Sequence, residues 1–150
     1  MTPDFRKFGL LQILQQFRRI HWGSHFKELT QQEYMLLSAI ACAQEAHPDS
    51  PGVYVSALAE ELVVSVSMVS KMLKALEEKG WIVRTIDPNS RRNTFVSLSG
   101  EGSRLYEEEA ARAEAANCRI VARMGEETMA RFLKDAEKLA ECIAQELGSS

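Results

Sequence analysis

Two short segments in the middle of the chain place apolar residues at helical spacing, with almost nothing between them. The positions predicted to face inward are Leu58, Ala59 and Leu62 in the first helix and Val66, Val69, Met72, Leu73 and Leu76 in the second. Ser56 and Ser65 stand where these helices begin, and a serine hydroxyl there accepts a hydrogen bond from an otherwise unpaired backbone N–H. Gly80 ends the second helix. Two helices joined so tightly must cross at a steep angle, which predicts a helix-turn-helix unit.

The pattern changes from helical to strand-like after Gly80. Residues 81–86 and 93–98 are rich in β-branched and aromatic side chains, and the six residues between them are typical of turns. This order predicts a β-hairpin whose tip carries Arg91 and Arg92. A helix-turn-helix unit followed directly by such a hairpin is a winged helix.

Further helical patterns precede this winged helix. A first helix over residues 4–21 is predicted by the helical spacing of Phe5, Phe8, Leu11, Leu14, Phe17 and Ile20. Thr30 and Glu33 form a capping box, which marks the start of a second helix. We expect that helix to run to about Gln44, and residues 53–55 to add a third strand to the hairpin.

Two long helices are predicted after the hairpin. Ser99 caps the first, Gly125 separates it from the second, and Gly148 follows the second. Both carry apolar stripes and are too long to be covered by a compact winged-helix core. An apolar stripe with nothing in its own domain to cover it usually packs against a second chain, which predicts a homodimer.

The fold class expected is mainly α with a small β-wing (α+β), a winged helix-turn-helix with long N- and C-terminal dimerisation helices. At 150 residues the chain is long enough to bury a core as one domain. We assign residues 1–150 to a single domain. Within it, residues 28–99 form the winged-helix DNA-binding lobe, and residues 4–22 and 100–147 form the helical dimerisation region.

Charge is distributed unevenly along the chain. The formal net charge is −3 at pH 7, which argues against a general polyanion binder. Residues 63–95, however, carry six Lys or Arg residues against three Asp or Glu residues, and phosphate groups respond to this local charge. The positive segment coincides with the second helix of the unit and the hairpin, so we expect it to bind double-stranded DNA.

Several other classes of protein find no support in the sequence. No apolar run approaches the roughly 18 residues of a membrane span, and no signal-peptide pattern occurs, so we expect a cytoplasmic protein with no membrane contact. A nucleophile elbow, a phosphate-cradling glycine loop and a paired-carboxylate pattern are all missing, which argues against an enzyme and calls for no cofactor. Glu107, Glu108 and Glu109 are expected to form a solvated helix face.

Histidine and cysteine spacing predicts neither a metal site nor a disulfide framework. His21 and His25 are four residues apart, but Gly23 between them breaks the helix that would align them. The three cysteines, Cys42, Cys118 and Cys142, are odd in number and far apart. We expect them to be buried, unreactive thiols in a reducing compartment.

The helix-turn-helix and the hairpin contain a recognisable series of residues. In chain order they are Leu58-Ala59, Leu62, Val64-Ser65, Ser67, Val69-Ser70-Lys71, Leu76-Glu77, Lys79-Gly80, Arg84, Pro88, Arg91-Arg92, Val96, Leu98-Ser99 and Gly102. In this order and spacing they resemble the MarR family of bacterial transcription regulators. The resemblance implies that the N-terminal helix and the last two helices form a dimer interface.

Three positions depart from the pattern of that family. Val63 replaces a common glycine in the turn of the unit, and because a β-branched residue disfavours positive φ, we expect a reshaped turn. Lys71 replaces a frequent arginine, which weakens the inference of bidentate guanine recognition. Ser90 replaces the frequent aspartate that orients the neighbouring arginine, so we expect a less preorganised wing.

The second helix of the unit is expected to lie in the major groove of DNA. The residues on it that the core does not need are Ser65, Ser67, Met68, Ser70, Lys71 and Lys74. The hydroxyls suit phosphate and base contacts, Met68 suits a thymine methyl group, and the lysines suit phosphate or guanine, although capping and solvation are alternative roles. Arg91 and Arg92 are expected to enter the minor groove or bind its flanking phosphates, and the resemblance favours Arg92 for insertion.

The resemblance implies a homodimeric repressor that releases DNA when a small molecule binds. Two recognition helices roughly 34 Å apart would prefer an inverted-repeat operator. The implied effector pocket lies between the dimerisation helices and the DNA-binding lobe and draws on Phe17, Ile20, His21, Trp22, Phe26, Tyr34 and Leu37, side chains that fit a plain core equally. The alternatives are a redox- or metal-responsive regulator of the same fold, or a winged-helix protein-interaction module without DNA binding.

Overall fold

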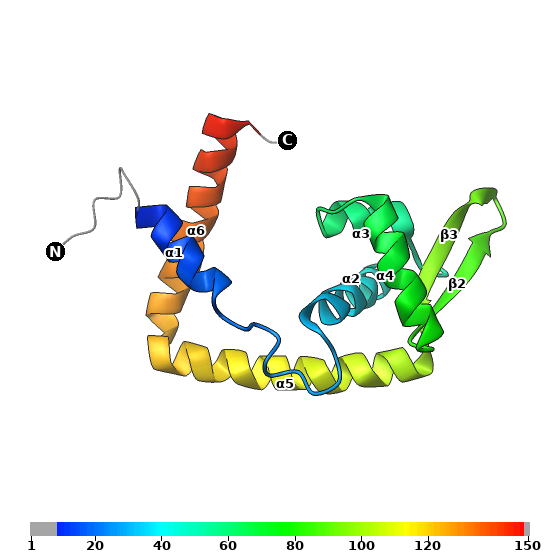
Figure 1. Cartoon of the computed structure of the whole chain (residues 1–150), viewed down its shortest axis with the longest axis horizontal. Coiled ribbons are helices and arrows are strands. Elements are labelled where there is room, and N and C mark those ends of the chain that lie inside the picture. The colour runs from blue at the N-terminus through cyan, green and yellow to red at the C-terminus, as the bar shows by residue number, and fades with distance from the viewer. Residues whose placement is uncertain (1–8, 149–150) are drawn as a thin grey trace. The chain divides into compact units, whose positions relative to one another are not determined.

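The computed structural model describes residues 9–148, in which helices and strands follow one another as Figure 1 shows. Their bounds are α1 (Gly9–Arg18), α2 (Gln31–Ala46), β1 (Val53–Tyr54), α3 (Val55–Glu61), α4 (Val66–Glu78), β2 (Ile82–Asp87), β3 (Ser90–Leu98), α5 (Gly100–Met124) and α6 (Glu126–Leu147). The chain divides after Ala110 into two compact units, and the winged helix belongs to the first. The predicted class, mainly α with a small β-wing, is confirmed.

The predicted first helix is present and ends three residues earlier than expected. α1 covers residues 9–18, whereas the apolar spacing predicted a helix over residues 4–21. Phe5 and Phe8 lie outside the described residues. At the C-terminal end, the backbone leaves the helix in tight turns, with the N–H groups of Arg19 and Ile20 bonded to carbonyls three residues earlier.

Three antiparallel strands form a small sheet in the order β1-β3-β2. Val53 of β1 pairs with Val96 of β3, and Ile82 of β2 pairs with Leu98 of β3. β1 is the predicted third strand, one residue shorter than expected. β2 and β3 form a hairpin, called the wing below, which lies beside α4 (Figure 1).

The turn of the wing is tighter than predicted. The residue types predicted a six-residue connection over residues 87–92, whereas β2 extends to Asp87 and β3 begins at Ser90. Only Pro88 and Asn89 remain in the turn. The physical reason is that the carboxylate Oδ1 of Asp87 accepts a hydrogen bond from the backbone N–H of Asn89 at 2.9 Å, which closes the turn locally.

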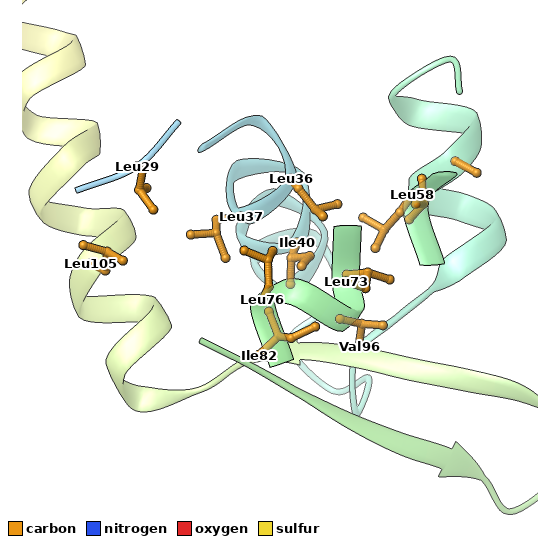
Figure 2. Packing of buried hydrophobic residues seen from close by; sticks show 12 residues of the cluster. Leu29, Leu36, Leu37, Ile40, Leu58, Leu73, Leu76, Ile82, Val96 and Leu105 are labelled. Carbon is orange, nitrogen blue, oxygen red and sulfur yellow. The ribbon is translucent and has the colours of Figure 1, made fainter. Parts of the chain in front are cut away.

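A buried cluster joins α2, α3, α4, the sheet and the start of α5 (Figure 2). Its members are Leu29, Leu36, Leu37, Ile40, Leu58, Ala59, Val69, Leu73, Leu76, Ile82, Val96 and Leu105. Figure 2 shows Leu29 and Leu105 at one end of the cluster and Leu58 at the other. This core fixes the relative positions of the helix-turn-helix and the wing.

Five of the eight positions predicted to face inward from α3 and α4 are buried. Leu62 and Met72 are half-buried and pack against the core. Val66 is the exception, because its side chain is 51% exposed. As the first residue of α4, Val66 directs its Cβ toward the N-terminal end of the helix and past the core.

Side-chain caps fix the starts of α2 and α4 as predicted. Thr30 Oγ1 accepts a hydrogen bond from the backbone N–H of Glu33 at 3.2 Å, and the Glu33 carboxylate accepts one from the backbone N–H of Thr30 at 2.9 Å. Ser65 Oγ accepts a hydrogen bond from the backbone N–H of Met68 at 3.2 Å. Both caps satisfy N–H groups that have no partner inside their helix.

The start of α5 was predicted correctly, and that of α3 was not. Ser99 Oγ accepts a hydrogen bond from the backbone N–H of Gly102 at 3.0 Å, so Ser99 caps α5 as expected. Ser56, predicted to cap α3, lies inside that helix, which begins at Val55 after the N-cap residue Tyr54. The helix starts early because Tyr54 ends the strand β1 and leads directly into it.

α3 and α4 end in the same backbone motif, with one residue in the left-handed region. Two N–H groups bond back to the last turn, at 3.0 and 3.2 Å after α3 and at 3.0 and 2.9 Å after α4. The left-handed residue is Gly80 after α4 (φ 75°) and Val63 after α3 (φ 54°). The prediction of a reshaped turn is therefore wrong. The side chain of Val63 is 89% exposed, and the packing of both helices holds its unfavourable backbone conformation.

Glu109 contradicts the prediction that the acidic cluster of α5 is solvated. Glu107 and Glu108 are exposed, but Glu109 is fully buried. Its carboxylate accepts hydrogen bonds from the backbone N–H groups of Lys27, at 3.0 and 3.2 Å, and Glu28, at 3.0 Å. Periodicity did not reveal this role, because the partners lie in a distant loop whose backbone donors replace water.

The three cysteines are exposed in the chain as described and form no disulfide. The prediction of buried thiols is therefore wrong. Cys118 and Cys142 lie on α5 and α6, in the unit that buries little of its own surface. No helix within residues 9–148 is long and apolar enough to cross a membrane.

Candidate nucleic-acid interface

One side of α4 packs on the core and the other faces solvent. Ser67, Lys71 and Lys74 are exposed on the outer side. The exposed side therefore carries two positive charges and a hydroxyl near the helix N-terminus, where unpaired N–H groups also favour anions. Such a surface can contact phosphate oxygens and base edges.

The other residues of α4 predicted to contact DNA differ in accessibility. Met68 is 48% exposed, and Ser65 is exposed while its oxygen caps the helix. Ser70 is half-buried, and its backbone oxygen accepts a hydrogen bond from Arg84. Of the six predicted positions on α4, Ser70 is thus the least accessible.

Arg84 of β2 fastens α4 to the wing, a role that sequence analysis missed. Its Nη2 donates to the backbone oxygen of Ser70 at 3.2 Å, and its Nε lies 3.4 Å from Oε2 of Glu77. Both partners belong to α4, so the contacts of Arg84 hold α4 and the wing in a fixed relative position. Arg84 is part of the motif quoted above, but only the fold shows what it contacts.

Arg91 and Arg92 lie in β3 rather than in the turn where they were predicted. Pairing between β2 and β3 skips residues 91–93, because successive residues of β2 pair with Thr94 and then with Ser90. The skipped residues form a bulge, and a bulge redirects side chains away from the regular alternation of a strand. Both arginines are exposed there.

A contact from β1 closes the turn of the wing. The hydroxyl of Tyr54 donates a hydrogen bond to Oδ2 of Asp87 at 2.7 Å, which raises the pKa of Tyr54 above its ordinary value. Asp87 is 4% exposed, and the ring of Tyr54 stacks on Phe95 with centroids 4.6 Å apart. Sequence analysis missed this pair. The available signal was an aspartate before proline, a frequent start of a turn, but nothing local indicated its tyrosine partner.

The residues predicted to line an effector pocket form two groups. Phe17 and Trp22 stack with centroids 6.0 Å apart, and Trp22 Nε1 donates to the backbone oxygen of Phe17 at 3.1 Å. Phe26 contacts Tyr34 with centroids 4.4 Å apart, and both pack against the core. Burial raises the pKa of Tyr34.

The remaining residues of that predicted pocket have different environments. Ile20 and His21 are exposed, whereas Leu37 is fully buried in the core cluster. His21 and His25 follow the end of α1, so no helix aligns them. Among the described residues, no group of three or more His, Cys, Asp or Glu side chains is arranged to hold a metal ion.

Sequence comparisons place this chain among bacterial regulators. The profile of the MarR family matches residues 29–94. The transcriptional regulator HosA of Escherichia coli O111:H- is 31% identical over 100 residues, which are 67% of this chain and 69% of HosA. Residues 29–94, which the family profile matches, contain the helix-turn-helix and most of the wing.

Solved structures of related regulators share this fold. A mutant MarR from E. coli in complex with operator DNA has a TM-score of 0.72 at 20% identity, over 87% of this chain and 90% of that chain. PcaV from Streptomyces coelicolor in complex with its natural ligand has a TM-score of 0.69 at 22% identity, over 88% and 89% of the two chains. At these identities the likeness concerns the fold.

Proposed function

Because this chain belongs to the MarR family of transcriptional regulators, we propose that it is a sequence-specific repressor that binds DNA as a homodimer and is released by a small-molecule effector. One observation carries the proposal: the outer side of α4 and the bulge of β3 expose positive side chains on elements that Arg84 fastens together. The relatives are transcriptional regulators, and no enzymatic activity is proposed.

In the proposed complex, α4 lies in the major groove. Lys71 and Lys74 contact phosphates or guanine, Ser65 and Ser67 contact phosphates near the helix start, and Met68 contacts a thymine methyl group. Ser70 lies at the edge of this contact surface. The wing carries Arg91 and Arg92 to the minor groove or its flanking phosphates, where a guanidinium is favoured by the negative potential.

The homodimer is proposed because α1, α6 and the C-terminal end of α5 all expose large apolar side chains. Two copies of α4 related by a two-fold axis would recognise an inverted-repeat operator whose half-sites lie about one DNA turn apart. A regulator of chromosomal genes works in the cytoplasm, which is the location we propose.

The effector is proposed to bind near the loop between α1 and α2, where aromatic side chains gather. Phe17, Ile20, His21 and Trp22 would form one side, and Phe26 and Tyr34 the other, over the buried Leu37. A ligand that prefers a dimer with misplaced recognition helices would lower the affinity for DNA. Bound DNA would lower the affinity for the ligand by the same factor. PcaV supports this part by analogy, since it is described with a natural ligand.

The test is binding to DNA from the region upstream of its own gene, titrated against salt concentration. The wild type should bind selectively, with an affinity that falls steeply as salt rises, because Lys and Arg release counterions from DNA. Arg92→Ala should bind about tenfold more weakly and lower the salt slope by about one contact. Arg131→Ala on α6 removes an arginine that is also exposed but lies outside the lobe, and should bind like the wild type.

Absence of selective binding at low salt by a folded dimer would contradict the proposal. It would favour the alternative of a winged-helix protein-interaction module. An equal loss of affinity in Arg92→Ala and Arg131→Ala would show that bulk charge rather than the wing governs binding.

A further inference from the structure

We propose that Tyr54 and Asp87 are positioning residues that hold the side chains of Arg91 and Arg92 in the direction that binding to DNA requires. The inference deepens the DNA-binding function proposed above and rests on it. Neither residue belongs to the predicted contact set. Asp87 is almost fully buried and Tyr54 is half-buried, so both act through the backbone of the wing.

The first step is the reach of Tyr54 across the sheet. β3 is the central strand, so a bond from Tyr54 of β1 to Asp87 of β2 joins the two edge strands over it. Stacking on Phe95 of β3 fixes the ring of Tyr54 on the way. All three strands are therefore held together close to the point where the wing turns.

The second step is the double role of the Asp87 carboxylate. One oxygen accepts from the hydroxyl of Tyr54 at 2.7 Å, and the other accepts from the backbone N–H of Asn89 at 2.9 Å. A carboxylate that is engaged on both oxygens and buried cannot change rotamer without losing both bonds. The turn at residues 88–89 is thereby locked.

The third step connects that lock to the arginines. The register of β2 and β3 shifts between Ile86 and Asp87, and the residues left over on β3 are Arg91, Arg92 and Asn93. The bulge is closed on one side by pairing at Asp87 and on the other by pairing at Ile86. If the Asp87 side opened, the bulge would merge with the turn into one longer loop, and the arginines would lose their defined direction.

The hydrogen bonds of Asp87 with Tyr54 and Asn89, called the lock here, also bear on the replacement of aspartate by Ser90. An aspartate at that position would orient the neighbouring arginine, and its replacement predicted a less preorganised wing. In this chain a carboxylate lies three residues earlier, at Asp87. It orders the backbone of the turn and does not orient an arginine directly. Preorganisation increases affinity because less conformational entropy is lost when the arginines meet DNA.

The experiment compares Tyr54→Phe with the wild type on DNA from the region upstream of its own gene. Phenylalanine keeps the stacking on Phe95 and removes only the hydroxyl that bonds Asp87. We expect affinity to fall about fivefold, which is less than the full effect of one hydrogen bond to a charged group, because the hydroxyl influences DNA binding only by ordering the wing. The matched control is Tyr106→Phe, which removes a tyrosine hydroxyl from α5 outside the wing and should leave the affinity unchanged.

A double-mutant cycle with Arg92→Ala separates positioning from general damage. If Tyr54 acts through the arginines, Tyr54→Phe should weaken DNA binding in the wild-type background and change it little in the Arg92→Ala background. Hydrogen exchange of the backbone N–H of Asn89 gives a readout without DNA. It should speed up in Tyr54→Phe, and more so in Asp87→Asn, whose single amide oxygen cannot accept both the Tyr54 and the Asn89 hydrogen bonds.

Each outcome decides between the two claims. Equal weakening in both backgrounds, or no weakening at all, would overturn the positioning role while leaving DNA binding intact. Unchanged exchange at Asn89 would overturn the lock itself. Failure of the wild type to bind DNA selectively would instead overturn the proposed function, and the exchange measurement would still report on the lock.

Discussion

The winged-helix lobe and α6 differ in how far their apolar residues are buried. In the lobe, Leu36, Leu73 and Val96 are fully buried within a single cluster. In α6, by contrast, no residue is buried. The large apolar residues of α6 that remain exposed are Phe132, Leu133, Leu139, Ile143 and Leu147.

The difference shows that the apolar residues of the lobe are buried when the chain folds, whereas those of α6 could be buried only by association with a further surface. Apolar surface contributes roughly 25 cal/mol per Å² when it leaves water. The lobe gains this within one chain, since α2, α3, α4 and the sheet cover one another. The apolar residues of α6 gain it only when a further surface covers them. Mutations in the two regions should therefore change different measurable quantities.

The largest expected effect is on α6. Leu139→Asp combined with Ile143→Asp places two charges on its apolar side. We expect the proposed dimer to dissociate at least about 100-fold more readily, because a charge in an apolar interface is left without water or a partner. DNA binding should fall with it. Sedimentation velocity over a concentration series measures the dissociation.

The control adds the same two charges to the opposite side of α6. Ala130 and Gln145 lie on that side at the helical angle of 100° per residue, and both are exposed. Ala130→Asp with Gln145→Asp should remain dimeric. Equal dissociation of both double variants would mean that the apolar stripe is not the interface.

The second effect belongs to the lobe. Leu73→Ala should lower the free energy of unfolding by about 3 kcal/mol, because it removes fully buried methyl groups and leaves a cavity. The dissociation constant of the proposed dimer should not change. Urea denaturation measures the loss, and exposed Glu78→Ala on the same helix should stay within about 0.5 kcal/mol of the wild type. A dimer weakened by Leu73→Ala would erase the distinction between the two regions.

A smaller effect concerns the left-handed residue after α3. Val63→Gly should stabilise the lobe by about 1 kcal/mol, because glycine adopts φ of 54° without the steric cost that valine carries. Thermal unfolding measures it. The mirror experiment is Gly80→Val after α4, where open space surrounds the position and only the backbone conformation opposes a side chain. That variant should lose stability, and a gain there would refute the backbone argument.

The smallest effect depends on pH and links α2 to the end of α4. Burial raises the pKa of Glu33, but hydrogen bonds from Lys79 and Thr30 and the charge of Lys79 outweigh it, so the pKa lies below its ordinary value of 4.5. A lowered folded-state pKa adds stability above the unfolded value, and that stability disappears as the pH falls through the folded value. Glu33→Gln should cost roughly 0.5 kcal/mol at pH 7, with no difference left well below pH 4.

Urea denaturation at several pH values measures this prediction. Glu33→Gln keeps a side chain that accepts the Thr30 N–H bond, so the difference reports the charge alone. Exposed Glu60→Gln on α3 gives the background. A difference between Glu33→Gln and wild type that persists unchanged in acid would mean that packing, not charge, is responsible.

Much of the fold could be predicted from the sequence. The capping box at Thr30, the caps at Ser65 and Ser99 and the glycine end at Gly80 were read correctly, because their hydrogen bonds join residues at most five apart. A prediction from local residue types was wrong where a neighbouring element of structure determined the backbone instead. Ser56 has the chemistry of a cap, yet strand β1 runs directly into α3 and places the N-cap two residues earlier, at Tyr54.

The candidate interface was predicted less completely than the fold. Exposed lysines on α4 follow from periodicity, because positions opposite the core face solvent. The position of Arg92 in a strand bulge does not, since the register between β2 and β3 depends on pairing along the whole hairpin. The exposure of the cysteines was also missed, because a cysteine fits either side of a helix.

The sequence by itself determined the order of helices and strands, the inward positions of the helix-turn-helix and the charge of its outer side, since each depends on neighbours within a few residues. The tertiary structure alone decided which polar groups meet. Tyr54 and Asp87 are 33 residues apart, and Lys27 and Glu109 are 82 apart. Such pairs form because the common core brings their elements together, and burial then makes an unpaired polar group costly.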